Sequence, residues 1–415
     1  MTLAPTDEAL VPGPAGPAPA IAPRGGVLEV LAVFLRLGCT SFGGPVAHLG
    51  YYRAEFVERR RWLGEAEYAD IVALCQFLPG PASSQTAVSL GILRAGVPGG
   101  LAAWLGFTAP SALAMILFAY GVGQVGDISH AAWLHGLKLV AVAVVAQAVW
   151  GMARNLLPDR TRVTLAVAAT LLVLAVPTSL GQVVAIAIGA VLGWALIREP
   201  PKPLSGTLGF SLPRGVAIGA LLAFAALLVV LPLVADHGGH VLQLIDRFYR
   251  AGALVFGGGH VVLPLLHQAV VPPGWIGDDG FLAGYGAAQA VPGPLFTFAA
   301  YLGTAMQPAP SGWLGGVICL LAIYLPSFLL LLGVLPFWDA LRRQAPVQAA
   351  LRGVNAAVVG VLLAALYTPI WTSAVGSPRD FGIALLAFLL LMFWKVPPWL
   401  VVVLGALGTQ ALAMV

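Results

Sequence analysis

Long apolar segments, separated by short polar loops, make up most of the chain. Many of them approach the roughly 20 residues that span a bilayer as a helix. Two segments, 68–93 and 281–304, are broken near the middle by Pro-Gly-Pro, at 79–81 and 292–294. Two prolines that flank a glycine cannot continue a helix, because proline removes a backbone donor and clashes with the preceding turn. The pattern therefore predicts membrane helices with central breaks, which survive in lipid only where they line a protein cavity.

The break motif recurs within an ordered series of landmarks, which predicts an internal duplication. Gln76 and Gln289 stand three residues before the first proline of each motif and are 213 positions apart. A further break precedes each motif, with Phe-Gly-Gly-Pro at 42–45 and Phe-Gly-Gly-Gly at 256–259. Both halves continue with a helix that contains Pro-Ser and close on two short apolar segments. We predict a disordered tail at 1–26, repeats at 27–199 and 246–415, and a linker with one connecting transmembrane helix at 200–245.

The composition excludes a soluble globular protein. Of 415 residues, 59% are hydrophobic and 9% charged, whereas a soluble domain has roughly 25% charged residues. The net charge of +4 lies mainly in short loops, so it concerns membrane orientation and not nucleic acid. The three cysteines lie in apolar surroundings and indicate free core thiols, without a disulfide framework or a metal site. We predict an all-α polytopic protein of the lipid bilayer that uses no cofactor.

The loop charges predict that the two halves are inverted relative to each other. The loop at 51–65 holds four arginines, whereas the equivalent loop at 271–279 holds no lysine or arginine but two aspartates. Since Lys and Arg favour the cytoplasmic side, the two loops are expected on opposite sides of the membrane. The alternative is that the broken segments span the bilayer fully. The expected fold is two inverted-topology repeats whose discontinuous helices meet near the membrane midplane.

The residues at the breaks resemble a known family. A tandem chain with Phe-Gly-Gly-Pro and Leu-Pro-Gly-Pro, repeated as Phe-Gly-Gly-Gly and Val-Pro-Gly-Pro, is similar to the chromate ion transporters in their long, two-domain form. The resemblance covers nearly the whole chain outside the tail and the connector. It implies export of the chromate dianion across the inner membrane of a bacterium, giving chromate resistance, with sulfate as a structural relative of the substrate. Pro45 stands where the second repeat has Gly259, so the two half-sites differ chemically.

A tetrahedral dianion presents only oxygen acceptors, so its site must supply donors and positive potential. A half-helix that starts after Pro-Gly-Pro directs backbone N–H groups and its positive dipole end toward the break. Glycine-rich loops allow consecutive N–H groups to approach an anion closely. The alternative is that Gly and Pro only permit close helix packing. The predicted substrate-binding residues at the breaks are Phe42, Gly43, Gly44, Gln76, Pro79, Gly80, Pro81, Ser83, Ser84, Gln85, Phe256, Gly257, Gly258, Gly259, Gln289, Pro292, Gly293, Pro294 and Thr297.

Four cations lie inside apolar segments, where a charge costs about 2.5–3.5 kcal/mol or more. Arg36 and Arg250 stand six residues before the Phe-Gly-Gly breaks, and we predict that they compensate the charge of the anion. For Lys138 and Arg352, side chains that extend to the headgroup region are an equal alternative. Secondary candidates for substrate or proton binding, with ion pairing or ordinary packing as the alternative, are Glu29, His48, Asp70, Lys138, His260, Arg352 and Asn355.

The chain carries no signature of an enzyme. It lacks the zinc motif His-Glu-x-x-His, the nucleophile motif Gly-x-Ser-x-Gly and a nucleotide-binding loop. The sequence predicts a secondary transporter for chromate, driven by the membrane potential with proton antiport as an optional addition. Transport of sulfate or another oxyanion is one alternative, and an anion channel is the other. A homodimer is compatible with the sequence.

Overall fold

The computed structural model of the chain describes residues 25–124, 131–198, 212–235, 237–256, 259–341 and 344–414. Every regular element in these ranges is a helix, which confirms the all-α prediction. Residues 1–24 of the predicted tail, residues 200–211 of the predicted linker, and Gly257 and Gly258 lie outside them.

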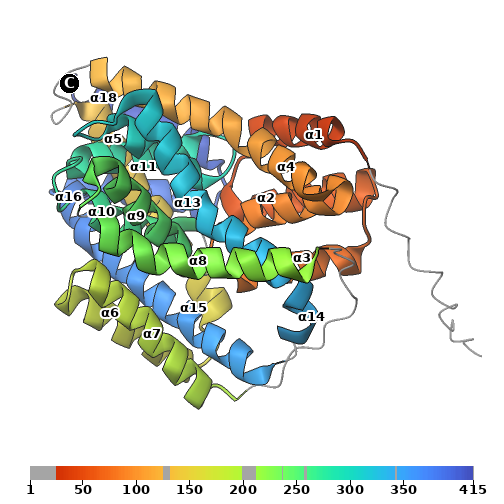
Figure 1. Ribbon diagram of the computed structural model, residues 1–415. Coiled ribbons are helices and arrows are strands. Elements are labelled where there is room, and N and C mark those ends of the chain that lie inside the picture. Colours follow the sequence, from red (N-terminus) through yellow and green to blue (C-terminus); the bar gives the residue numbers. More distant parts are fainter. Residues whose placement is uncertain are drawn as a thin grey trace, which may run out of the picture.

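Each half of the chain ends in two short helices, and the elements of the second half follow nearly the same order as those of the first (Figure 1). The first half comprises α1 Val27–Thr40, α2 Gly44–Tyr52, the π-helix η1 Arg53–Arg59, α3 Glu65–Phe77, α4 Ala82–Gln124, α5 Ala132–Leu156, α6 Arg160–Ala175 and α7 Ser179–Leu196. The connector is α8 Arg214–Ala235. The second half comprises α9 Gly239–Ala253, η2 Gly259–Val261, α10 Val262–Val270, α11 Asp278–Ala290, η3 Leu295–Thr297, α12 Phe298–Ala305, α13 Gly312–Val334, η4 Leu335–Phe337, α14 Trp338–Leu341, α15 Ala345–Ala365, η5 Leu366–Trp371, α16 Thr372–Ala374, α17 Pro378–Met392 and α18 Pro398–Leu412.

Five helical stretches in the described residues are long and apolar enough to cross a membrane, as judged by length and composition. They are Ala82–Gln124, Ala132–Leu156, Arg214–Ala235, Gly312–Phe337 and Ala345–Ala374. The outer helices α6, α7, α8, α17 and α18 expose many leucine, valine and aromatic side chains. A surface of this kind is stable against lipid and not against water. The chain is therefore a polytopic membrane protein.

Both Pro-Gly-Pro motifs end one helix and start another, as their backbone chemistry requires. The first separates α3 from α4, and the second separates α11 from η3 and α12. Inside α4, Ala95 and Gly96 have non-helical dihedral angles, so that a short half-helix precedes the long spanning part. In the second half the same two parts are the separate helices α12 and α13. Each repeat therefore contains a half-helix that begins directly at its Pro-Gly-Pro break.

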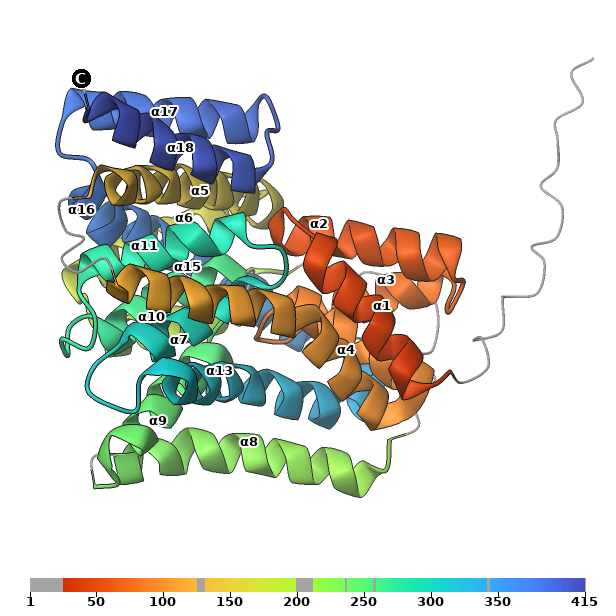
Figure 2. The same cartoon turned by 90° about the horizontal axis from the view of Figure 1, so that it is seen from above.

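The two halves exchange helices. Helix α5 of the first half packs on α17 and α18 of the second, and α15 of the second half packs on α6 and α7 of the first. Figure 2 shows α5, α17 and α18 side by side, and Figure 1 shows α6 and α7 beside α15. Small residues allow this contact: a Cβ added at Gly353 would lie 2.0 Å from the Gly189 carbonyl oxygen, and one at Gly136 would lie 2.4 Å from that of Gly405. Glycine faces let membrane helices approach to backbone contact.

The cysteine prediction needs a correction. All three cysteines are free, and Cys75 and Cys319 are buried, but Cys39 is exposed. Helix α1 buries the face that carries Val30, Phe34 and Leu37, and Cys39 lies off that face. Apolar neighbours in the sequence do not indicate a core position in a membrane protein, because its outer surface is apolar as well.

Candidate functional site

Each Pro-Gly-Pro break is completed by the opposite half of the chain. Gly80 and Gly293 have φ angles of 123° and 107°, which residues with a side chain rarely adopt. The Gly80 N–H donates to the Val255 carbonyl at 2.7 Å, and the Gly293 N–H donates to the Ser41 carbonyl at 2.9 Å. Ser41 and Val255 are 214 positions apart and directly precede the two Phe-Gly-Gly motifs. The Pro-Gly-Pro break of each repeat is therefore hydrogen-bonded to the residue before the Phe-Gly-Gly break of the opposite repeat.

The helices that contain Pro-Ser, α4 and α13, pack against the glycines of the Pro-Gly-Pro breaks. A Cβ added at Gly80 would lie 2.7 Å from Ser327 Oγ on α13, and one added at Gly293 would lie 2.7 Å from Ser111 Oγ on α4. Ser111 and Ser327 are equivalent residues of the two repeats, 216 positions apart. The contact is thus reciprocal: each glycine faces the serine of the opposite repeat.

The two Phe-Gly-Gly breaks also approach each other. A Cβ added at Gly259 would lie 3.5 Å from the Pro45 ring. The Tyr324 hydroxyl of α13 lies 3.4 Å from Ser84 Oγ, just after the first Pro-Gly-Pro, and its ring centroid lies 5.5 Å from that of Phe296, just after the second. All four breaks therefore meet. We call the described residues 41–45, 78–85, 254–256, 259 and 289–297, with the Pro-Ser turns of α4 and α13, the break junction.

Several buried polar atoms at the break junction have no hydrogen-bond partner within the described residues. They are Ser41 Oγ, Gln85 Oε1, Gln289 Nε2 and Ser327 Oγ. Ser41, Gln85 and Ser327 are completely buried. Leaving such a group unpaired costs about 1–3 kcal/mol, and it is uncommon in folded proteins. Unpaired hydroxyl and amide groups near helix breaks are expected of a site for a polar ligand.

The half-helix that begins α4 adds positive potential to the break junction. Pro81 accepts a hydrogen bond from the Gln85 N–H at 2.9 Å, which starts the helix directly after the break. The N–H groups of the first turn therefore lie beside Ser83 and Ser84, both buried. A helix N-terminus carries about half a positive charge and binds anions through these groups.

The four cations predicted within apolar segments are paired with protein groups. Arg36 is 53% exposed and Arg250 is 40% exposed, so both lie nearer the surface than the break junction. The pairs are Arg36 Nη2 with Glu55 Oε2 at 3.1 Å, Arg250 with Asp246, Lys138 Nζ with Asp279 Oδ1 at 2.6 Å, and Arg352 Nη2 with Gln348 Oε1 at 3.3 Å. The role of Arg36 and Arg250 in compensating the charge of the anion stays a prediction, and the partners that the structure gives them are carboxylates.

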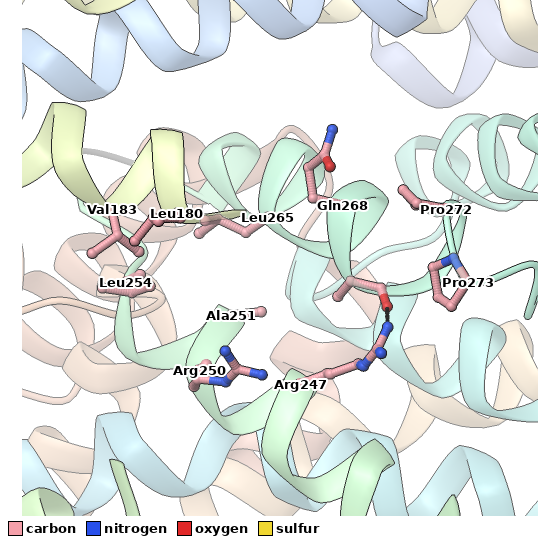
Figure 3. A pocket seen from close by; sticks show the side chains of 11 residues that line it. Leu180, Val183, Arg247, Arg250, Ala251, Leu254, Leu265, Gln268, Pro272 and Pro273 are labelled. Carbon is pink, nitrogen blue, oxygen red and sulfur yellow. Dashed lines mark hydrogen bonds between the residues drawn. The ribbon is translucent and has the colours of Figure 1, made fainter. Parts of the chain in front are cut away.

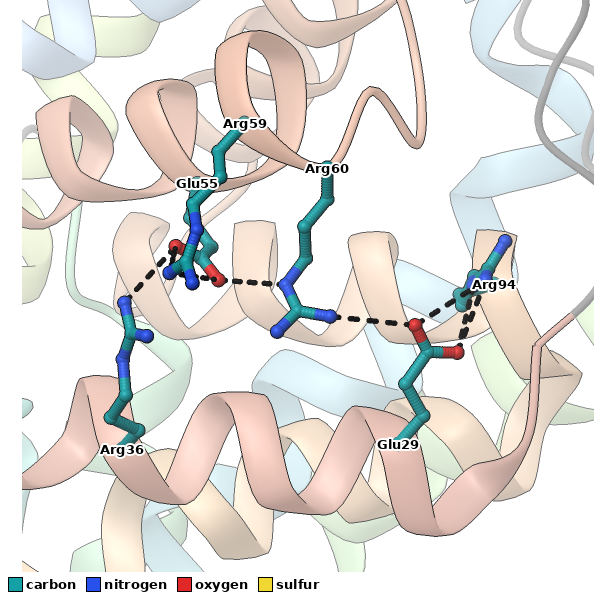
Figure 4. Close-up of polar contacts among 6 residues, drawn as sticks. All are labelled: Glu29, Arg36, Glu55, Arg59, Arg60 and Arg94. Atoms are coloured by element: carbon teal, nitrogen blue, oxygen red, sulfur yellow. Dashed lines mark hydrogen bonds and ion pairs between the residues drawn. The ribbon is translucent and has the colours of Figure 1, made fainter.

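Glu55 is the centre of a cluster that ties α1 to η1, the π-helix that follows α2 (Figure 4). Arg60 Nε donates to its carboxylate at 2.7 Å, Arg59 at 3.0 Å and Arg36 at 3.1 Å. Burial raises the pKa of this carboxyl, but the hydrogen bonds from Arg60 and Arg59 outweigh that effect and hold the pKa below its ordinary value. Glu55 accordingly stays ionised and holds the three arginines.

The same cluster contains Glu29, which the sequence offered as a proton carrier or an ion-pair partner. Its carboxylate lies 3.1 Å from Arg94 Nη2, at the end of the first half-helix, and 3.5 Å from Arg60 (Figure 4). The Arg94 guanidinium also lies 5.0 Å from the centre of the Trp62 ring. Ion pairing is therefore the role that the structure shows for Glu29.

A cavity of about 570 Å³ lies between α7, α9 and α10 (Figure 3). Two arginines of α9 line it together with the Gln268 amide: Arg250, paired with Asp246, and Arg247, which donates to the Ala269 carbonyl. Leu254 also lines it, one residue before the Val255 carbonyl that accepts from Gly80. The cavity therefore leads from a basic wall to the edge of the break junction.

The remaining predicted residues are distributed unevenly around the breaks. Gln76 is exposed, whereas Gln289, its equivalent, is half-buried. Phe42 is half-buried, with its ring centroid 6.2 Å from that of Trp399 on α18. Asp70 is buried on α3, and Asn355 is half-buried on α15.

Both predicted histidines beside the breaks have hydroxyl partners. His48 Nδ1 lies 3.3 Å from Ser83 Oγ, and its Nε2 lies 3.2 Å from the Ser41 carbonyl oxygen. His260 Nδ1 lies 2.7 Å from the Tyr285 hydroxyl. Thr297, the predicted hydroxyl of the second Pro-Gly-Pro segment, donates to the Pro294 carbonyl at 2.9 Å.

The sequence reasoning did not propose Ser41, Ser111, Tyr324 or Ser327 as site residues. A signal for two of them was present, since Pro-Ser recurs in register in the two repeats. It could not be connected with the breaks, because the contacts run between repeats. Tyr324 occupies the position of Thr108 in the first repeat and carries no shared motif.

The chain is similar to known proteins over most of its length. A family model described as chromate transporter matches residues 28–194 and again residues 242–409. A chromate transport protein of Pseudomonas aeruginosa is 29% identical over 343 residues, which cover 80% of this chain and 79% of that protein. A chromate transport protein of Cupriavidus metallidurans is 27% identical over 398 residues, covering 93% of each.

A shorter relative matches less than half of the chain. The uncharacterized transporter YwrB of Bacillus subtilis is 34% identical over 163 residues, which are 37% of this chain but 79% of that protein. No solved structure matches the chain. The family model covers well over half of the sequence, and both of its matches contain the paired breaks. The chain therefore belongs to the chromate transporter family.

Proposed function

We propose that this protein exports chromate from the bacterial cytoplasm across the inner membrane and binds the dianion at the break junction. The observation that carries the proposal is a group of buried polar atoms, those of Ser41, Gln289 and Ser327, that have no hydrogen-bond partner among the described residues where the breaks meet. Chromate presents four oxygen acceptors and no donor, so hydroxyl and amide groups can each direct a proton toward it. The family and its named relatives support chromate as the substrate.

The electrostatics of the break junction suit a dianion that must bind and then leave. A free buried guanidinium would hold a dianion tightly, whereas neutral donors and the N-terminus of α4 provide a weaker attraction. The cavity lined by Arg247 and Arg250 supplies the approach, because its basic wall raises the local concentration of anions. In this proposal Arg250 attracts the substrate and the neutral groups bind it.

The direction of transport follows from the charge. A dianion that leaves a negative-inside cell moves downhill by about 2.3 kcal/mol per charge per 100 mV. The potential can therefore drive export without ATP. The reciprocal contacts of Gly80 with Ser327 and of Gly293 with Ser111 support two repeats of inverted topology, which would present equivalent paths to the two sides of the membrane.

The test is uptake of radiolabelled chromate into inside-out membrane vesicles, with the potential and the pH gradient set independently. Potential-dependent accumulation is expected. Ser327→Ala and Ser41→Ala are each expected to raise the KM about 10- to 100-fold, since a hydrogen bond to a charged group contributes about 1.5–3 kcal/mol. Ser89→Ala is the matched control, because Ser89 is equally buried but already donates to the Gln85 carbonyl of its own helix at 2.8 Å.

Two outcomes would contradict the proposal. Equal losses in Ser89→Ala and Ser327→Ala would show a general effect of cavity formation and not a site at the break junction. Absence of chromate accumulation under any potential would remove the chromate function altogether. Parallel assays with sulfate decide between a chromate transporter and a more general oxyanion transporter, because the two anions share shape and charge.

A further inference from the structure

His48 is a buried imidazole of the first repeat, beside a contact between the two repeats. It lies on α2 and is 1% exposed. Its Nε2 lies 3.2 Å from the Ser41 carbonyl oxygen, which also accepts the Gly293 N–H of the other repeat. Its Nδ1 lies 3.3 Å from Ser83 Oγ in the first turn of α4. Both ring nitrogens therefore face groups of the break junction.

The partners of the ring determine its tautomer. A carbonyl oxygen only accepts, so Nε2 of His48 carries a hydrogen. In the neutral ring Nδ1 is then an acceptor, and the Ser83 hydroxyl must donate its proton to it. A Ser83 hydroxyl used in this way cannot donate to an anion.

A second proton on the ring reverses this arrangement. Nδ1–H now donates to Ser83 Oγ, so that the Ser83 hydroxyl becomes an acceptor toward His48 and its own proton is free to point elsewhere. The first turn of α4, where Ser83 lies, is the positive end of the half-helix. Protonation of His48 thus adds one positive charge and one hydroxyl donor to the region in which the dianion is proposed to bind.

The groups around the ring do not supply a competing negative charge. The elements packed on His48 present the Ser41 carbonyl, the Ser83 hydroxyl and the Phe107 ring, whose centroid lies 5.1 Å from that of the imidazole. The nearest titratable side chains traced through these contacts are Tyr52, which packs on Phe107, and Tyr324, which bonds to Ser84. No carboxylate contacts the imidazole within the described residues.

The second repeat does not contain an equivalent pair. In register with His48 it has Val262, and in register with Ser83 it has Phe296. His260 lies at another position of the second Phe-Gly-Gly segment and bonds to Tyr285 on α11. Among the residues that the structure describes, the pair of His48 and Ser83 therefore has no counterpart at the equivalent positions of the second repeat.

We propose that His48 is the proton-coupling residue of the transporter, and that protonation of His48 and binding of the anion at the break junction favour each other. The inference rests on the proposed anion site. Because coupling free energies are reciprocal, each bound dianion draws up to one proton onto the ring. The proton and the dianion then move together with a net charge of −1. Movement of the proton and the anion in the same direction is cotransport, whereas the sequence predicted proton antiport as the optional addition.

The test measures proton uptake upon binding. Chromate adjusted to the same pH is added to weakly buffered, detergent-solubilised protein at about pH 8, and the pH change is recorded beside binding by equilibrium dialysis. Because burial disfavours the charged ring, the wild type is expected to take up less than one proton per bound chromate, in an amount that increases when the titration is repeated at about pH 7. His48→Gln, which keeps an amide donor and acceptor but cannot be protonated, is expected to bind more weakly and to take up none.

Two further variants separate a coupling role from a structural one. His260→Gln is the matched control, and its proton uptake should equal that of the wild type. Ser83→Ala should retain a titrating His48 but lose the donor that protonation releases, so its binding should depend less on pH than that of the wild type. Proton uptake that persists in His48→Gln, or that is lost in His260→Gln instead, would overturn the inference. Absence of chromate binding to the wild type would instead remove the proposed function itself.

Discussion

At the scale of single residues, the two Pro-Gly-Pro glycines are the most constrained positions of the break junction. Gly80 and Gly293 combine a positive φ with contact to a serine of the opposite repeat. A side chain at either position would be strained by the backbone and would also collide with Ser327 or Ser111. These glycines therefore fix both the local turn and the approach of the two repeats.

Gly80→Ala is expected to cost at least about 1–3 kcal/mol from the backbone conformation alone and to abolish vesicle uptake of chromate. Thermal unfolding in detergent and the uptake assay measure the two effects. Gly121→Ala is the control, because Gly121 lies in α4 with open space around its Cα, where alanine favours the helix. If Gly80→Ala were as stable and active as Gly121→Ala, the proposed contact between repeats would be wrong.

At the scale of elements, Glu55 of η1 connects this π-helix with α1 and with Arg60 through three arginines. Its carboxylate is 5% exposed, whereas Arg36 and Arg59 are more than half exposed. If Glu55 lost its charge, the exposed arginines would still be hydrated, which limits the loss of stability. The cluster therefore contributes moderately to the stability of this part of the fold.

Glu55→Gln is expected to lower the free energy of unfolding by about 1–2 kcal/mol at neutral pH, seen as a lower Tm. Since the pKa of Glu55 is depressed in the folded protein, its stabilisation is complete above the unfolded pKa and is lost as the pH falls through the folded value. The difference from the wild type should therefore shrink below about pH 4. Glu58→Gln, at an exposed pair with Arg53, should change the stability by less than about 0.5 kcal/mol. A pH-independent loss in Glu55→Gln would point to packing instead of charge.

At the scale of the whole molecule, the exchange of α5 and α15 means that neither half encloses its own core. Helix α5 packs on α17 and α18, and α15 packs on α6 and α7. The four breaks likewise reach their partners only across the two repeats. The two halves should therefore fold as one unit.

Separate expression of the two halves, divided within residues 199–211, tests whether they fold as one unit. A tagged first half is expected to retrieve the second half from detergent extracts when the two are expressed together. Uptake by the pair should lie within about tenfold of the intact chain, because the linker contributes mainly to the effective concentration. Either half alone should give no stable, monodisperse protein. Stable isolated halves would contradict the exchange of helices.

The sequence was sufficient to predict the class of the protein and the positions of the breaks, for local reasons. Proline and glycine act on the backbone where they stand, so the ends of α3 and α11 just before Pro79 and Pro292 could be read directly. The apolar content likewise predicted a helical membrane protein. The cations were harder to interpret, because Glu55 and Asp279, the partners of Arg36 and Lys138, are far from them in the sequence and are identified only by their distances in space.

What the sequence determined by itself is thus the set of elements: two series of helices, each broken twice in register, and a family resemblance carried by the break motifs. Only the tertiary structure decided which breaks meet. It joined Gly80 to Val255 and Gly293 to Ser41, placed Ser327 and Tyr324 beside them, and set His48 between Ser41 and Ser83. The physical reason is that backbone breaks arise from local chemistry, whereas their hydrogen-bond partners are supplied by whichever helices pack against them.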